Sequence, residues 1–249
     1  PMASRPSPTV RGLSTELAYW QAQCRREVAT LGGTAGASLG TAGESRTVEV
    51  ELTEGETTAL LREVGAAYRT EINEVLLSAL AETLSGWSGA RRVCVGLEGH
   101  GREALVEELD VSRTVGWFTS VFPVWLEVPR SGEPGELLKA VKEQLRTVPR
   151  RGVGYGWLRF AHPDAQVRAS LSVGAPVVFN YLGQLDMEAQ GRGLLLASSE
   201  PAGATVSPRM ELRTGLTVNG GVLQGRLQLG WTYSPAVHGE ATVQALAAR

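Results

Sequence analysis

Apolar and polar residues alternate in several stretches of this chain, and a period of two is typical of β-strands with one buried face. Val93, Val95 and Leu97 form the most regular example. The same pattern predicts strands over 48–52, 121–128, 176–181, 210–218 and 227–233, with Asn219-Gly220 as the hairpin turn before the last of them. Pro123 cannot donate a main-chain hydrogen bond, so its strand is expected to have an edge or a bulge there.

Apolar residues that recur every three to four positions predict helices over 13–29, 53–69, 71–87, 134–148 and from residue 240 onward. Thr53 and Glu56 have the spacing of a capping box. We interpret Trp87 as core packing. Helices and strands are intermixed, so the fold class is α/β or α+β with a mixed sheet. The last helix reaches only about two turns before Arg249, so we expect the chain to break off inside it.

Composition excludes some classes of function. The chain has 249 residues, of which 43% are hydrophobic and 20% charged, as in an ordinary globular protein. A net charge of −2 gives no indication of nucleic-acid or membrane binding, and no apolar run is long enough to span a bilayer. Cys24 and Cys94 lack metal spacing and the three histidines lie far apart, so we expect no metal site and a reducing, cytoplasmic location.

Two groups of polar residues follow predicted strands: residues 98–103 (EGHGRE) and 180–183 (NYLG). If they converge, Glu98 is a candidate general base, and Asn180 or Tyr181 could steady an enolate-like oxygen. The glycines of 150–156 (RRGVGYG) could join the two groups. No GxxxxGK[ST] follows them, so we reject nucleotide binding. No GxSxG motif is present, which argues against catalysis by a nucleophilic serine.

Four segments stand in a recognisable order: EGHGRE (98–103), DVSRTVGWFT (110–119), RRGVGYG (150–156) and FNYLGQ (179–184). With them the chain resembles the C-terminal half of an epimerization domain of a nonribosomal peptide synthetase, in the condensation/epimerization superfamily. The resemblance covers 13–249, and 1–12 is interpreted as a linker or a cloning remnant. It implies an α/β fold like one lobe of chloramphenicol acetyltransferase, a mixed β-sheet with packed helices, forming half of a V-shaped two-lobe domain.

The resemblance also implies an activity, inversion of the α-carbon from L to D. The substrate would be an aminoacyl or peptidyl thioester held by the 4'-phosphopantetheine arm of a peptidyl carrier protein. No cofactor would bind the domain directly, because the thioester acidifies the α-proton. Catalytic residues carried over are Glu98, Asn180 and Tyr181. Supporting or substrate-binding residues carried over are His100, Arg102, Trp117, Gly154 and Tyr155, with orientation preferred to catalysis for His100.

One departure from the family matters, because the HHxxxD sequence occurs nowhere in the chain. The resemblance assigns it to an N-terminal lobe, so the isolated lobe is expected to be inactive and to expose an apolar patch. Two alternatives stay open. The first is a condensation or dual condensation/epimerization domain that forms peptide bonds. The second is a non-catalytic lobe that docks a carrier protein.

Overall fold

The computed structural model describes residues 8–32, 38–103, 110–185, 203 and 205–249. A six-stranded mixed sheet has the order β1-β6-β5-β4-β2-β3. Its strands are β1 (Arg46–Glu51), β2 (Arg92–Gly99), β3 (Ser120–Glu127), β4 (Val177–Gln184), β5 (Leu216–Leu223) and β6 (Arg226–Tyr233). β4 is parallel to β2 and to β5, and the other pairs are antiparallel. The predicted α/β class with a mixed sheet is confirmed.

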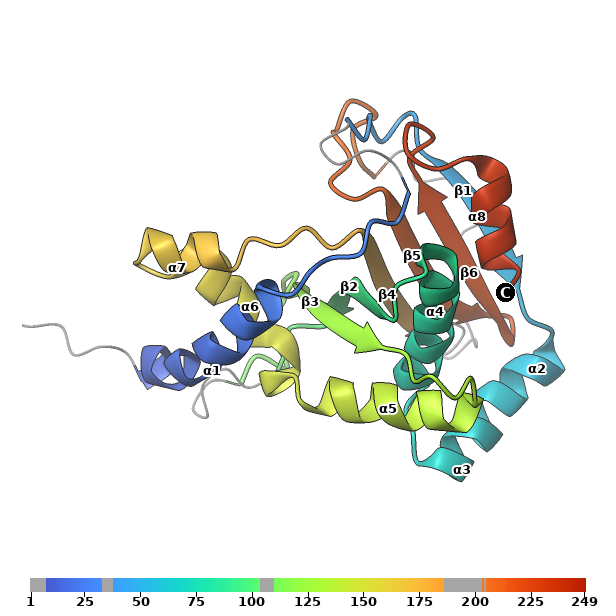
Figure 1. Cartoon of the computed structure of the whole chain (residues 1–249), viewed down its shortest axis with the longest axis horizontal. Coiled ribbons are helices and arrows are strands. Elements are labelled where there is room, and N and C mark those ends of the chain that lie inside the picture. The colour runs from blue at the N-terminus through green and yellow to red at the C-terminus, as the bar shows by residue number, and fades with distance from the viewer. Residues whose placement is uncertain (1–7, 33–37, 104–109, 186–202, 204) are drawn as a thin grey trace, which may run out of the picture.

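The longer helices pack against one face and one edge of this sheet (Figure 1). α4 (Ile72–Ser88) contacts β2, α8 (Glu240–Ala247) contacts β1 and β6, and α5 (Pro134–Arg146) contacts β3. α1 (Pro8–Cys24) and α6 (Val153–Gly156) lie beyond the β3 edge, and the short helices are α2 (Glu54–Ala59), α3 (Gly65–Tyr68) and α7 (Ala165–Ser170).

Strand alternation separates a buried face from a polar one. Val93, Val95, Val177, Phe179 and Leu216 point to the helix-covered side and are at most 1% exposed. Burying apolar side chains of this size stabilises the fold by about 1.5–3 kcal/mol each. The opposite face is polar over β1, β5 and β6, with exposed or half-buried side chains there: Thr47, Glu49, Glu51, Thr217, Asn219, Gln228 and Thr232.

Several sequence predictions are confirmed with small shifts. Thr53 caps α2 through a capping box with Glu56, and Pro134 occupies the first turn of α5. β3 is an edge strand, which explains the tolerance of Pro123. The first helix ends at Cys24, earlier than the predicted 29. The predicted helix over 53–69 forms, with a π-helical turn at Leu60–Val64 between α2 and α3.

Three local predictions are wrong. Asn219 and Gly220 lie inside β5, and the hairpin turn comes later at Gln224 and Gly225, whose φ angles are 52° and 73°. The stretch from Met210 to Thr214 precedes β5 instead of belonging to it. The glycine-rich 150–156, which the sequence suggested as a glycine loop joining the two polar groups, instead forms a 3₁₀ turn (Pro149–Gly152) that leads into α6.

Candidate functional site

The candidate site is a row of polar side chains across three adjacent strands. Leu97 pairs with Phe179 in the parallel β2–β4 ladder, so Glu98 and Asn180 are the next residues on each strand and share the polar face. Asn180 in turn pairs with Asn219 on β5. The convergence of the Glu98 and Asn180 groups that the sequence suggested is therefore present in the fold.

Glu98 has an unusual environment for a carboxylate. It is half-buried at the end of β2 and pairs across the ladder with Val121 of β3. Burial raises the pKa of its carboxyl group, and no cation offsets this effect among the described residues. A carboxylate with a raised pKa is a stronger base than one in water, which suits it to accept a proton from carbon.

The turn after Glu98 is fixed by its own polar groups. The main-chain N–H of Arg102 donates to Nδ1 of His100 at 3.0 Å, so the other ring nitrogen, Nε2, carries the hydrogen. That nitrogen lies 3.4 Å from Oε1 of Glu103. Gly101 has φ +66°, and a Cβ there would be 1.6 Å from the carbonyl oxygen of Phe118, so only glycine fits. His100 thus holds the shape of the turn.

Arg102 anchors the segment that carries SRTVGWF. Its Nη1 donates to the carbonyl oxygens of Val111 and Thr114 at 2.6 and 3.0 Å, and its Nη2 donates to that of Gly116 at 3.2 Å. The guanidinium also lies 4.5 Å from the centre of the Phe118 ring. Several bonds from one planar cation define the path of this segment, which therefore depends on Arg102.

Apolar side chains lie exposed near the polar row. Trp117 in the anchored segment is 91% exposed, Val121 beside Glu98 is 46% exposed, and Leu182 near the end of β4 is 57% exposed. Exposed apolar side chains that form a contiguous patch mark an interaction site. Val121 pairs directly with Glu98, so at least one exposed apolar side chain lies beside the polar row.

The segment 150–156 packs against the helix-covered face of β2 and β3, near the site. Gly152 has φ +83°, and a Cβ there would meet the Phe122 ring at 2.2 Å. The carbonyl oxygen of Arg151 lies 3.9 Å from the position of a Cβ on Gly99. Arg150 and Arg151 both have positive φ angles, of 42° and 52°, so this turn is strained and needs external support.

Helix α1 supplies that support. Glu16 is only 5% exposed, forms an ion pair with Arg150 and accepts a hydrogen bond from Nε1 of Trp20 at 3.2 Å. Gly154 lies against it, because a Cβ there would be 2.3 Å from Oε2 of Glu16. Tyr155 is buried and its hydroxyl donates to the carbonyl oxygen of Leu171 at 2.7 Å. Gly154 and Tyr155 thus lie among groups that hold this turn against the sheet.

Tyr181 occupies a different position from Asn180. It alternates to the helix-covered face, where its ring lies 3.7 Å from the position of a Cβ on Gly220 and packs against the core. Burial raises the pKa of its phenol. Asn180 therefore shares a face with Glu98, and Tyr181 reaches the end of β4 from the other side.

Three polar residues near the site were not assigned a role from the sequence. Asn219 was assigned to a hairpin turn with Gly220, but in the structure it lies in β5 and extends the polar row. Ser120 pairs with Gly99, and its buried Oγ has no hydrogen-bond partner among the described residues. The same holds for Oε2 of Glu103, whose side chain is only 16% exposed. For Glu103 the available signal was its place as the second carboxylate of EGHGRE.

The described residues contain no group of three or more metal-binding side chains. Within the same part of the chain, no helix combines the length and apolar character needed to cross a bilayer.

Comparison with known sequences identifies relatives over most of the chain. The sequence profile of the condensation domain family matches residues 10–249. Surfactin synthase subunit 1 from Bacillus subtilis (strain 168) is 42% identical over 201 residues, which are 80% of this chain and 6% of that protein. Bacitracin synthase 3 from Bacillus licheniformis is 36% identical over 241 residues, which are 94% of this chain and 4% of that protein. The chain thus spans a small part of each relative.

Solved structures agree with this result. The epimerization domain from the third module of tyrocidine synthetase B matches with a TM-score of 0.83 and 33% identity, over 96% of this chain and 53% of that one. The X-domain from teicoplanin biosynthesis matches with a TM-score of 0.68 and 16% identity, over 95% of this chain and 52% of that one. The second match concerns the fold alone. In both cases the chain spans about half of the solved structure.

Proposed function

The chain belongs to the condensation domain family, and from that premise we propose that it is the C-terminal lobe of an epimerization domain in a nonribosomal peptide synthetase. The observation that supports this most is the row Glu98–Asn180, a half-buried carboxylate without a cation beside an amide on the same face. The likeness to the tyrocidine synthetase epimerization domain also favours it.

The proposed reaction starts with an aminoacyl or peptidyl thioester on the phosphopantetheine arm of a carrier protein. The carboxylate of Glu98 takes the α-proton, and the electron pair of the C–H bond moves into the thioester as an enolate. The amide N–H of Asn180 stabilises the negative oxygen. Return of a proton to the opposite face, from an acid on the N-terminal lobe, restores the thioester with inverted configuration. No electrons are gained or lost.

The neighbouring groups would shape this site. Arg102 holds the segment that presents Trp117, and Trp117 would close over the thioester or against the second lobe. Tyr181 and the turn at 150–156 would set the position of the strand ends from the helix-covered side. His100 would keep the turn after Glu98 in place.

The test is exchange of the α-proton in deuterated buffer, measured by mass spectrometry on a carrier-bound aminoacyl thioester with the complete two-lobe domain. Glu98→Gln should slow exchange about 10²–10⁴-fold, as for loss of a general base. Glu49→Gln, on the same face at the far edge of the sheet, is the control and should leave exchange unchanged. Full exchange in Glu98→Gln would exclude this carboxylate from the mechanism.

A second candidate function is peptide-bond formation, alone or combined with epimerization. The match to the condensation domain profile favours it, because that profile covers the family as a whole. The same complete domain, given a loaded donor carrier and a loaded acceptor carrier, would then release a dipeptidyl thioester. Dipeptide without α-proton exchange would replace the epimerase proposal, and carrier binding with neither product would leave a docking role.

A further inference from the structure

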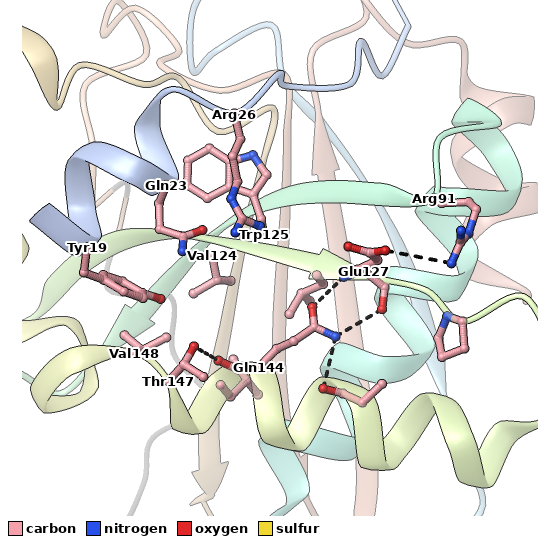
Figure 2. Close-up of a pocket in the computed structure, with 14 residues that line it drawn as sticks. Tyr19, Gln23, Arg26, Arg91, Val124, Trp125, Glu127, Gln144, Thr147 and Val148 are labelled. Atoms are coloured by element: carbon pink, nitrogen blue, oxygen red, sulfur yellow. Dashed lines mark hydrogen bonds and ion pairs between the residues drawn. The ribbon is translucent and has the colours of Figure 1, made fainter.

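A groove runs along the outer edge of β3, between α1 and α5 (Figure 2). Its volume is about 490 Å³, and its floor is the edge strand over 124–127. Tyr19, Gln23 and Arg26 of the α1 segment line one side, and Gln144 and Thr147 of the α5 segment line the other. None of these residues belongs to the polar row at Glu98.

The main chain of β3 shows what this groove can bind. The N–H of Val128 donates to the carbonyl oxygen of Arg91 at 2.8 Å, so Val128 points toward β2. Directions alternate along an antiparallel strand, so the main-chain groups of Glu127, Trp125 and Pro123 point outward, into the groove. Pro123 has no N–H, whereas Trp125 presents both an N–H and a carbonyl.

One of these outward positions is already filled by a peptide-like group. The side-chain amide of Gln144 accepts from the N–H of Glu127 at 2.6 Å and donates to its carbonyl oxygen at 3.1 Å (Figure 2). This is the pair of bonds that a residue of an added antiparallel strand would make. Next to it, the outward main-chain groups of Trp125 have no hydrogen-bond partner among the described residues. The buried indole Nε1 of Trp125 has none there either. The edge is thus capped at Glu127 and open at Trp125.

The rim of the groove is cationic although the chain as a whole has a net charge of −2. Glu127 lies 2.9 Å from Nη2 of Arg92 and 3.9 Å from Nη2 of Arg91. A hydrogen bond from Arg92 and the charges of Arg91 and Arg26 hold the pKa of Glu127 below its usual value. Arg26 and Arg91 line the groove with Glu127 as its one carboxylate, and Arg92 beside the groove pairs with that carboxylate, so the surplus positive charge favours an acidic occupant.

We propose that this groove binds an extended, acidic polypeptide segment, which adds to β3 as a further antiparallel strand at Trp125. Strand addition uses main-chain hydrogen bonds for affinity and side-chain pockets for selectivity. The segment comes from the synthetase polypeptide outside these residues, because the matched region is only 4% of a relative such as bacitracin synthase 3. That source rests on the proposed function, whereas the binding chemistry does not.

The first test measures binding to this chain of a fluorescent ten-residue peptide that alternates threonine and glutamate. Its counterpart alternates threonine and lysine. We expect the acidic peptide to bind more tightly, and Arg26→Glu to weaken it about fivefold or more, with a strong dependence on salt. Arg25→Glu is the matched control, since Arg25 is the preceding residue and does not line the groove. Equal binding of both peptides, or equal effects of both variants, would overturn the proposal.

A steric variant tests the position independently of charge. Ala140→Trp fills the α5 side of the groove and should abolish peptide binding, whereas Lys139→Trp, exposed on the same helix, should not. Circular dichroism and thermal unfolding of both variants establish that they are folded. Tight binding by a folded Ala140→Trp variant would place the peptide elsewhere.

The source of the segment is tested in the full synthetase by a photo-crosslinking amino acid, benzoylphenylalanine, at Gln23 or, as control, at Gln21 of the same helix. Position 23 should crosslink to an acidic interdomain segment and position 21 should not. Crosslinks from position 23 to a second copy of this chain, or to a folded domain, would overturn the proposed occupant. Neither binding test depends on epimerase activity, so failure of the proposed function would not be mistaken for failure here.

Discussion

At the scale of single residues, the carboxyl groups of this chain differ in the direction in which the fold shifts their pKa values. Burial raises the pKa of Glu98, whereas hydrogen bonds to Ser112 and Thr53 lower the pKa of Asp110 and Glu56, respectively. Asp110 and Glu56 make local turns and caps. When Glu98 is ionised, its burial instead lowers the stability of the folded chain. Such an unfavourable ionised group is typical of catalytic residues.

This difference predicts a pH-dependent stability for Glu98→Gln. The stability linked to protonated Glu98 is fully present below the ordinary pKa of 4.5 and is lost as the pH rises through the raised folded value. Replacement by glutamine removes this loss. In urea unfolding, the variant should be more stable than the parent chain near about pH 7.5, and the gain should shrink toward about pH 4. A gain that grows as the pH falls would contradict the assigned burial.

A second prediction at this scale concerns Arg102. Lysine keeps the charge but has one donor nitrogen in place of the planar fork whose Nη1 and Nη2 reach Val111, Thr114 and Gly116, so the segment carrying Trp117 should shift. Arg102→Lys should slow α-proton exchange in the complete domain by up to roughly 10²-fold, mainly through kcat, with little change in thermal stability. Arg130→Lys, at an exposed position of a turn, is the control. Normal exchange by Arg102→Lys would show that this segment does not position the substrate.

The sequence indicated Glu98 and Asn180 as chemistry-bearing residues, but it could not show that they are neighbours. Their adjacency depends on the parallel register of β2 and β4, which are separated by some 80 residues along the chain. Strand alternation places Asn180 and Tyr181 on opposite faces, but which of the two shares the face of Glu98 follows only from that register. The groups that lie near Glu98 through tertiary contacts, such as Ser120, were therefore missed.

At the scale of elements, the strained turn before α6 is held by its fit to β3. Gly152→Ala would place a methyl group inside the Phe122 ring and would force alanine into a left-handed conformation. We expect a loss of roughly 2–5 kcal/mol in the free energy of unfolding. Gly132→Ala is a matched control, since Gly132 has a similar φ of +71° with nothing within 4 Å. A similar, small loss of unfolding free energy in both variants would show that the contact with Phe122 does not contribute to stability.

Long periodic elements were predictable from sequence, and special turns were not. Apolar residues at helical spacing mark the buried faces of α4 and α5. Apolar residues at every second position mark β2 and β6. Asn219-Gly220 is a good turn signal, but pairing of β5 with both β4 and β6 extends the strand through it to Leu223. Tertiary pairing thus overrode local preference. Arg150, one of the two left-handed arginines of this turn, pairs with Glu16, more than 130 residues away.

At the scale of the whole molecule, the exposed apolar groups beside Glu98 predict self-association. The chain alone should form dimers or larger species in sedimentation velocity, and Leu182→Ser should weaken this association about tenfold, near the loss expected for one buried leucine. Phe160→Ser, which removes a 73% exposed side chain outside this group, is the control. A monodisperse monomer at high concentration would contradict the existence of an uncovered interface.

The order of strands has a consequence for how the protein is made. β1 near the start of the chain is completed only by β6, whose Tyr233 pairs with Arg46. During translation, the nascent β1 must therefore wait until almost all of these residues have left the ribosome. Such long-range pairing folds slowly and leaves sheet edges open in the meantime. Until β6 has been synthesised, β1 has no partner strand and one edge of β5 stays unpaired, so the incomplete sheet is open to pairing with other chains.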